Sequence, residues 1–197
     1  MTPLNEQQLE LLHIQRIEQI KKAALKVFAR RGIIGTKMSM IAAEAGISQG
    51  LSYRYFKSKE ELFITLIQDA LEEAKNSMEQ INHLSGTPIE KMRTLTKNML
   101  EDNNKQFFML IQQATASDEV PEQAQQLLEQ FSKENPIQLL IPLFIEGQEM
   151  GQFCEGAPNK LLFCYFSIIT GLMLQEAQTD ENYWIHEVDL LMKVIMK

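Results

Sequence analysis

The sequence predicts an all-α protein with an N-terminal three-helix domain and a larger C-terminal helical domain. Apolar residues recur at helical spacing along most of the 197 residues, and no stretch sustains the alternation expected of a β-strand. The nine glycines and six prolines fall mostly between these periodic stretches, where helices are expected to end. Apolar residues make up 45% of the chain, which is enough to bury a hydrophobic core.

The first predicted helix covers residues 14–31. Its apolar residues share one face, and Gly32 follows where the helix is expected to end. The residues on that face are Ile17, Ile20, Ala24, Val27 and Phe28. A second, much shorter helix is predicted over about residues 37–45, so the chain turns back soon after the first helix ends.

A tight turn follows the second helix. Gly46 stands where the helix is expected to end in the left-handed conformation, which glycine adopts without strain. Ile47 can then pack between two short helices, and Ser48 can cap a third helix over residues 49–56. Two helices joined in this way form a helix-turn-helix, predicted here over residues 36–55. In DNA-binding versions, the second helix enters the major groove.

The third helix carries polar and tyrosine side chains that are not needed to fill a core. Gln49 can read adenine through two hydrogen bonds, Leu51 can touch a thymine methyl group, and Gly50 lets the backbone approach the duplex. The tyrosine hydroxyls, Lys37 and Lys59 suit phosphate oxygens, which position a protein on DNA. The predicted DNA contacts are Thr36, Lys37, Ser39, Ser48, Gln49, Gly50, Leu51, Tyr53, Arg54, Tyr55 and Lys59.

Charge is distributed unevenly along the chain. Residues 1–60 carry ten Lys and Arg against five Asp and Glu, a net charge of +5. Residues 61–197 carry nine against 21, a net charge of −12, which accounts for the −7 of the whole chain. This separation suggests that the N-terminal part faces a polyanion. For charge alone, a solvated helical face is an equally good explanation.

Capping motifs mark the starts of later helices. Ser58-Lys59-Glu60-Glu61, Thr87-Pro88-Ile89-Glu90 and Asn135-Pro136-Ile137-Gln138 each combine a capping side chain with Glu or Gln three residues later. Ala157-Pro158 is expected to open another helix. The apolar spacing after the first two motifs predicts two long helices, one over residues 58–81 and one over residues 87–111.

The C-terminal region contains two further apolar patterns. Residues 161–174 are apolar almost all the way round, so this helix should be central or lie in an interface. A narrower stripe on a final helix suggests a partner surface at the C-terminus. The stripe consists of Trp184, Val188, Leu191 and Ile195.

Residues 32–63, GIIGTKMSMIAAEAGISQGLSYRYFKSKEELF, resemble the DNA-binding signature of the tetracycline-repressor (TetR) family. The resemblance covers about residues 13–73. It implies a helix-turn-helix DNA-binding domain over 13–73 and a helical ligand-binding and dimerisation domain over 74–197. Ser52 occupies a position where the family usually has an inward apolar residue. Either the local packing differs there, or Ser52 turns toward DNA.

The resemblance also implies a function. A member of this family is expected to be a cytoplasmic, homodimeric repressor that binds a palindromic operator in double-stranded DNA. Its two recognition helices would read half-sites about one DNA turn apart. A small-molecule effector would favour an arrangement that lowers DNA affinity, and by linkage DNA would lower effector affinity equally. The link is expected to run through the long helix that starts near Lys59.

The effector pocket is expected to be apolar and aromatic. Methionines and aromatic residues of the C-terminal domain can line a pocket for a flat or greasy molecule, although most such residues are ordinary core. The candidates are Phe107, Phe108, Phe144, Tyr165 and Phe166.

The sequence lacks the motifs that would indicate an enzyme, a metal site, a disulfide framework or a membrane protein. Neither a known catalytic motif nor paired histidine spacing occurs, so no enzyme, cofactor or metal site is expected. Cys154 and Cys164 do not suggest a disulfide framework. The longest apolar run has 14 residues, and no secretory signal opens the chain, so no membrane partner is expected. The alternative is a helical small-molecule-binding or scaffold protein without DNA affinity, which leaves the first sixty residues unexplained.

Overall fold

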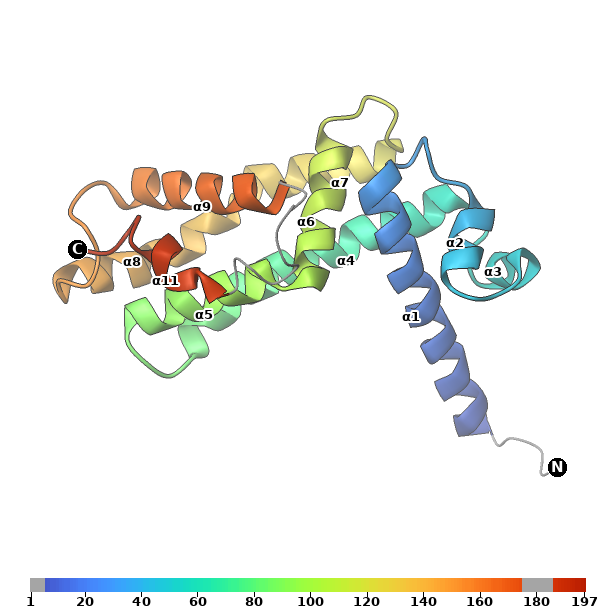
Figure 1. Cartoon of the computed structure of the whole chain (residues 1–197), viewed down its shortest axis with the longest axis horizontal. Helices are drawn as coiled ribbons and strands as arrows, with labels where there is room; N and C mark the ends of the chain where they lie inside the picture. The colour runs from blue at the N-terminus through green and yellow to red at the C-terminus, as the bar shows by residue number, and fades with distance from the viewer. Residues whose placement is uncertain (1–5, 175–185) are drawn as a thin grey trace.

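The computed structural model describes residues 6–174 and 186–197. These residues form helices and connecting loops, with one isolated bridge between Phe153 and Met196 as the only β-type pairing among them. Three N-terminal helices, here called the head, lie at one end of an elongated set of helices, here called the body (Figure 1). The fold is therefore all-α, as the sequence predicts.

The head consists of α1 (Glu6–Arg31), α2 (Met38–Glu44) and α3 (Gln49–Tyr55). Helix α1 begins eight residues before the predicted start at residue 14, and its N-terminal part extends away from the other two helices (Figure 1). Helices α2 and α3 match the predicted short helices to within one residue at each end. Helix α3 lies at the far end of the molecule from the C-terminus.

The body contains the other helices of the described residues. In chain order they are α4 (Lys59–Gln80), η1 (Ile81–His83), α5 (Pro88–Leu100), α6 (Asp102–Thr115), α7 (Glu122–Glu134), η2 (Pro136–Leu140), α8 (Ile141–Glu149), α9 (Pro158–Leu174) and α11 (Val188–Met192). Helix α4 runs from the head into the body, and α6 contacts α1, so the two parts are joined at two places.

Two of the predicted capping motifs form as expected. The Ser58 hydroxyl oxygen accepts a hydrogen bond of 3.1 Å from the backbone N–H of Glu61 and starts α4. At the start of α5, the backbone N–H of Thr87 donates to the Glu90 carboxylate at 2.8 Å. Pro158 opens α9, as Ala157-Pro158 predicts. Local chemistry therefore fixes where these helices begin.

The prediction of one long helix over residues 87–111 is wrong. The backbone leaves the helical conformation at Glu101, where ψ is 143°, and the chain continues as the separate helix α6. The side-chain amide of Asn104 donates to the Asn98 carbonyl at 2.6 Å, which satisfies a backbone group at the end of α5. Asp and Asn bond readily to nearby backbone, so the segment after Leu100 favours a helix break that apolar spacing alone does not reveal.

The capping motif predicted at Asn135 is also wrong. Asn135 has a left-handed backbone with φ of 44°, and its N–H donates to Phe131 at 3.2 Å, so it ends α7. The segment after it is the 3₁₀ helix η2, which has no side-chain cap, and α8 begins five residues later, at Ile141. Asn tolerates the left-handed conformation, and here this role as a helix end displaces the capping role.

The C-terminal apolar stripe does not form a partner surface. Val188, Leu191 and Ile195 are at most 6% exposed and pack into the core of the body. Trp184 lies outside the described residues. Helix α9, in contrast, buries only one face, and Phe163 on its other face is 70% exposed. The described part of the chain therefore leaves its most apolar helix partly uncovered.

The hydrophobic core has two parts. The first joins the head to α4, α6 and α7, and at its centre the rings of Phe28 and Phe63 meet edge to face with centroids 5.1 Å apart. The second lies within the body, where the rings of Phe144 and Phe153 stack with centroids 4.7 Å apart. The head is therefore anchored by a cluster distinct from the one that holds α5, α8 and α9.

Gly147 is required by the second core. A Cβ atom at this position would overlap the ring of Phe153 and lie 3.1 Å from Cβ of Pro88. Phe153 is 1% exposed and stacked on Phe144, so it has no free space to move into. We expect Gly147→Ala to lower the free energy of unfolding by about 1–3 kcal/mol, the usual cost of overpacking a core.

Urea denaturation measures this effect. Gly50→Ala is the matched control, because a Cβ atom there meets nothing within 4 Å and the position is helical. The control should be neutral or slightly stabilising, since alanine favours helix over glycine by up to about 1 kcal/mol. Equal stability of the two variants would contradict the packing explanation.

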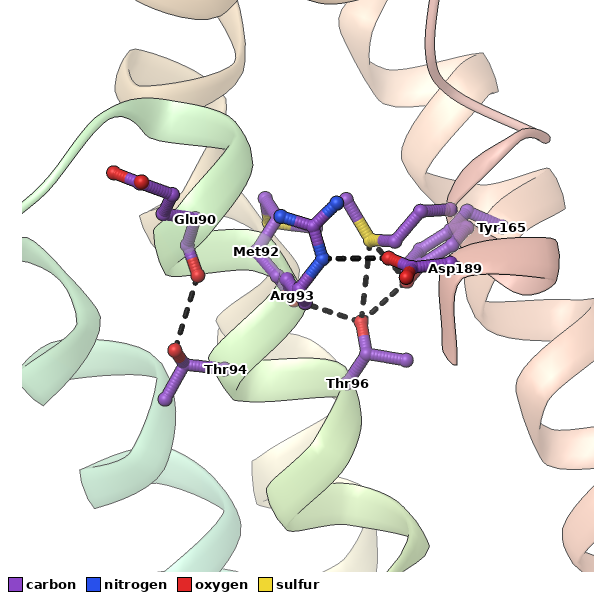
Figure 2. Close-up of polar contacts among 8 residues, drawn as sticks. Glu90, Met92, Arg93, Thr94, Thr96, Tyr165 and Asp189 are labelled. Atoms are coloured by element: carbon purple, nitrogen blue, oxygen red, sulfur yellow. Dashed lines mark hydrogen bonds and ion pairs between the residues drawn. The ribbon is translucent and has the colours of Figure 1, made fainter. Parts of the chain in front are cut away.

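A buried polar cluster ties α11 to α5 and α9 within the body (Figure 2). The Thr96 hydroxyl donates to the Met92 carbonyl at 2.7 Å and contacts the hydroxyl of Tyr165, which lies 3.2 Å from the sulfur of Met192. At the surface nearby, Arg93 pairs with Asp189 at 2.8 Å, which adds a second link between α5 and α11. Burial raises the pKa of Tyr165 to about 12, and the hydrogen bond with Thr96 only partly opposes this.

This raised pKa predicts a loss of stability at alkaline pH. Between pH 10 and 12 the Tyr165 phenol ionises in the unfolded chain but not yet in the folded one, so stability falls as pH rises. The loss should reach about 2–3 kcal/mol by pH 12. Tyr165→Phe should cost about 1 kcal/mol at pH 7 and flatten the decline of stability above pH 10. Parallel curves for the two proteins, measured by urea denaturation across pH, would contradict this.

Candidate nucleic-acid interface

The turn between α2 and α3 has the expected geometry. Gly46 has φ of +65°, the left-handed conformation, and the N–H of Ile47 donates to the Ala42 carbonyl at 3.0 Å. The side-chain amide of Gln19 on α1 donates to the Ala45 carbonyl at 2.6 Å. Ser48 caps α3 by accepting from the Leu51 N–H at 3.2 Å. Side chains and backbone of the head thus fix where α3 begins and how it is held.

Helix α3 presents a polar face to solvent. Gln49, Gly50 and Arg54 are exposed, and the Tyr53 side chain is 47% exposed. Apart from its chain neighbours and its own helix backbone, no atom of the described residues lies within 4 Å of a Cβ built on Gly50, so its backbone can be approached closely. These four residues lie together on the outer side of the helix, where a duplex could reach them.

Two predicted contacts on α3 are only partly available. Leu51 and Tyr55 are half-buried, and the ring of Tyr55 lies 5.1 Å from the ring of His13 on α1. Ser52 is fully buried, and its hydroxyl donates to the Gln49 carbonyl at 2.8 Å. Ser52 therefore packs inward and does not turn toward DNA, which resolves the question left open by the sequence.

Two other predicted contacts have structural roles. Thr36 is fully buried, and its hydroxyl donates to the Gly32 carbonyl at 2.7 Å, so its side chain is not available to DNA. The Lys59 ammonium donates to the carbonyls of Ile33 at 2.8 Å and Thr36 at 3.0 Å. Lys59 thus joins the start of α4 to the loop before α2. These bonds span more than twenty residues, so no local sequence pattern indicates them.

The placement of Lys59 makes it a positioning residue. We expect Lys59→Met to lower the free energy of unfolding by about 1–3 kcal/mol, because two hydrogen bonds from a charged donor are lost. Duplex affinity should also fall, since the loop that orients α2 loses its support. The slope of log affinity against log salt should stay unchanged, because no phosphate contact is removed.

Urea denaturation and a salt titration of duplex binding together test this role. Lys57→Met is the matched control for stability, because Lys57 is an exposed lysine two residues away. Unchanged stability with a shallower salt slope would show that Lys59 contacts phosphate instead.

The remaining predicted contacts lie at the start of α2 and α3. Lys37, Ser39 and Ser48 are exposed. Lys37 has an extended backbone at the N-terminal end of α2, so its ammonium can extend away from the helix. Lys37 and Arg54 are thus exposed cations of the head.

Polar contacts also connect the head to the body. The Lys21 ammonium pairs with Asp69 of α4 at 2.7 Å, and the Gln113 amide of α6 donates to the Ala29 carbonyl of α1 at 2.5 Å. Partial burial lowers the pKa of Lys21, but hydrogen bonds and charges from Asp69 and Glu18 outweigh this, so its net pKa is raised. A shift of α4 or α6 would therefore also displace α1, because these contacts join the helices.

The body contains a small apolar cavity between α4, α5, α6 and α9, with a volume of about 100 Å³. Phe107 and Phe108, two of the predicted pocket residues, line it and are half-buried. Phe144, Tyr165 and Phe166 do not line it. They are at most 6% exposed and pack in the second core, so their assignment to a pocket stays a prediction. Aromatic residues at helical spacing serve mostly as core here.

The described residues contain neither a membrane-spanning helix nor a cluster of metal ligands. Among residues 6–174 and 186–197, no helix combines the length and apolar character that crossing a bilayer requires. The same residues hold no group of three or more potential ligands that could bind a metal ion.

The chain is similar to known regulatory proteins. The model of the family described as "Bacterial regulatory proteins, tetR family" matches residues 20–66, which include α2 and α3. The HTH-type transcriptional regulator YerO of Bacillus subtilis is 33% identical over 101 residues, covering 49% of this chain and 35% of YerO. The fatty acid metabolism regulator protein of the same organism is 25% identical over 147 residues, covering 73% of each chain. The chain therefore spans only about a third of the first of these relatives.

A solved structure extends the similarity to almost the whole chain. The crystal structure of a TetR-family transcriptional regulator from Agrobacterium tumefaciens superposes with a TM-score of 0.71. It covers 94% of this chain and 100% of that chain, at 17% identity. At this identity the match shows the fold of head and body together.

Proposed function

Since this chain belongs to the TetR family of bacterial transcriptional regulators, we propose that it is an effector-controlled repressor that binds a palindromic operator as a homodimer. The two named relatives are an HTH-type transcriptional regulator and a regulator protein of fatty acid metabolism, and neither name is that of an enzyme. The observation that carries the proposal is the outer face of α3, where Gln49, Tyr53 and Arg54 are exposed while Ser52 packs inward. These side chains supply the hydrogen-bonding groups and the positive charge that base edges and phosphates accept.

The proposed contacts divide into two groups. Gln49 and the exposed edge of Leu51 lie at the start of α3, the part that reaches base edges in a major groove. Lys37, Tyr53 and Arg54 supply the donors for phosphate oxygens. Thr36 and Lys59 are not among the proposed DNA contacts, because the Thr36 hydroxyl and the Lys59 ammonium already form hydrogen bonds within the chain.

The proposed dimer would use α8 and α9. Four apolar side chains of these helices and the turn after α8 are at least 38% exposed: Ile145, Met150, Phe163 and Ile168. A second copy related by a two-fold axis would cover them and bring two heads to one duplex. Half-sites about 34–36 Å apart would then each receive one α3.

The proposed effector site is the cavity lined by Phe107 and Phe108. Both residues belong to α6, and Gln113 farther along the same helix bonds to the α1 backbone. Helix α4 also lines the cavity, and Asp69 on it pairs with Lys21 of α1. A ligand that moves α4 or α6 would shift the head and lower duplex affinity, and DNA would lower ligand affinity by the same factor.

Selection of bound duplexes from a random pool, with the full chain, tests this function. Enrichment of an inverted repeat, with half-sites separated by about one DNA turn, is expected. A pool that shows no enrichment would contradict the proposal and favour the alternative of a helical ligand-binding or scaffold protein without DNA affinity.

A further inference from the structure

The cavity between α4, α5, α6 and α9 has an apolar lining. Its apolar walls come from all four helices: Ala70, Ala74, Met78, Leu95, Met99, Phe107, Phe108, Ile111 and Met173. At about 100 Å³ it is smaller than the roughly 300–1,000 Å³ of typical ligand pockets. Three of the lining residues are methionines, whose flexible side chains rearrange readily, so the cavity can enlarge around a ligand.

The described lining of the cavity carries a negative charge and no positive charge. Among the described residues around the cavity, Glu73 is the one ionisable side chain, and Ser77, Asn98 and Asn104 are the polar ones. The Ser77 hydroxyl donates to the Glu73 carboxylate at 3.3 Å, which helps to orient it. No lysine, arginine or histidine is part of the described lining. A ligand carboxylate or phosphate would therefore find a negative charge and no cation.

Two nearby lysines pair with other carboxylates. The Lys21 ammonium pairs with Asp69 at 2.7 Å and Glu18 at 3.1 Å. Lys75, two residues after Glu73 on α4, pairs with Glu134 of α7 at 3.2 Å. The structure therefore places the nearest α4 cation against another carboxylate and not against Glu73.

Glu73 and Phe107 also line a second, open space. A wide groove of about 920 Å³ lies between α1, α4 and α6, and these two residues belong to its walls as well as to the cavity. The carboxylate of Glu73 and the ring of Phe107 thus stand where the apolar cavity meets the groove beside the head. A molecule seated there would have its apolar part in the cavity and its head group at the groove.

We propose that the cavity binds a cationic amphiphile, an organic ammonium with an apolar body, whose charged group lies between Glu73 and Phe107. The carboxylate attracts the cation, and the Phe107 ring adds a cation–π contact. The apolar body lies among the methionines. This inference rests on the proposed function, since it names the chemical class of effector for the proposed effector site.

Calorimetric titration of the full chain without DNA tests this inference. The probes are decyltrimethylammonium, decanol and decanoate, which share one alkyl chain and differ in the charge of the head group, each used below its micelle-forming concentration. We expect the cation to bind at least about tenfold more tightly than decanoate, because the single carboxylate attracts one and repels the other. Tighter binding of decanoate would overturn the proposal.

Two variants test whether the preference for a cationic head group comes from Glu73. Glu73→Gln should weaken decyltrimethylammonium binding about tenfold and leave decanol binding unchanged, because only a charge interaction is removed. Glu72→Gln is the matched control: Glu72 lines the groove but not the cavity, so this variant should bind both probes as the parent chain does. Equal loss in both variants, or no loss in Glu73→Gln, would overturn the proposal.

The outcomes separate this inference from the proposed function. Both titrations are made without DNA, so failure of the charge preference leaves the duplex selection unaffected. Conversely, preferential binding of the cation by a chain that selects no duplex would contradict the repressor function and support the ligand assignment.

Discussion

Phe163→Glu is expected to give a folded monomer that binds an inverted-repeat duplex about a thousandfold more weakly than the parent chain. Phe163 is 70% exposed on α9, so a carboxylate there costs little within one chain. In the proposed dimer the same carboxylate would be buried opposite its two-fold copy, with no partner charge. A single head should bind near the nonspecific level of about 10⁻⁴–10⁻⁶ M, compared with about 10⁻⁸–10⁻¹¹ M for specific binding.

Analytical ultracentrifugation and fluorescence anisotropy with a labelled duplex measure the two effects. Leu84→Glu is the matched control, because Leu84 is also an exposed apolar residue but lies in the loop after η1. The control should remain dimeric and bind as the parent chain does. A dimeric Phe163→Glu variant with unchanged affinity would show that α9 is not the interface.

Gln49→Ala is expected to weaken binding to the preferred duplex by at least about thirtyfold and to relax the sequence preference at one position of each half-site. A glutamine that makes two hydrogen bonds to a base contributes about 1–3 kcal/mol of discrimination, and a two-fold complex loses this at both half-sites. Gln49 is exposed, so the free energy of unfolding should not change.

A second duplex selection with this variant gives the direct comparison. Gln80→Ala, at the end of α4 and also exposed, serves as the control and should keep the parent preference. If Gln49→Ala and the parent chain prefer the same sequence, Gln49 does not recognise a base.

The helix-turn-helix could be predicted in detail because its signals are local. Gly46 is needed for the left-handed turn, Ser48 caps α3 through a backbone group three residues away, and Ile47 packs between the short helices. Each of these depends on residues within a few positions in the chain. The same holds for the starts of α4 and α5, where the caps at Ser58 and Thr87 are confirmed.

The errors concern interactions between distant segments or competing local roles. The hydrogen bonds from Lys59 to Ile33 and Thr36 join residues more than twenty positions apart in the sequence, and helical periodicity does not indicate them. Asn135 could start one helix or end another, and the structure uses it to end α7. The apolar spacing continued across Glu101, where the backbone nevertheless leaves the helix.

The ligand site illustrates the same limit. Periodicity identifies aromatic residues that face inward, but it does not distinguish a packed core from a cavity wall. Phe107 and Phe108 line the cavity, whereas Tyr165 is closed in by Thr96 and Met192. That difference depends on where α5, α9 and α11 meet, which only the folded chain determines.

The salt dependence of duplex binding tests the central claim, that the head holds α3 against a DNA duplex. For the parent chain, log affinity should fall linearly with log salt, because phosphate contacts release counterions. Lys37→Ala should make this slope shallower by about two, one for each half-site. Lys97→Ala, an exposed lysine on α5, should leave the slope unchanged. Affinity that does not respond to salt, or identical slopes for all three proteins, would contradict the claim.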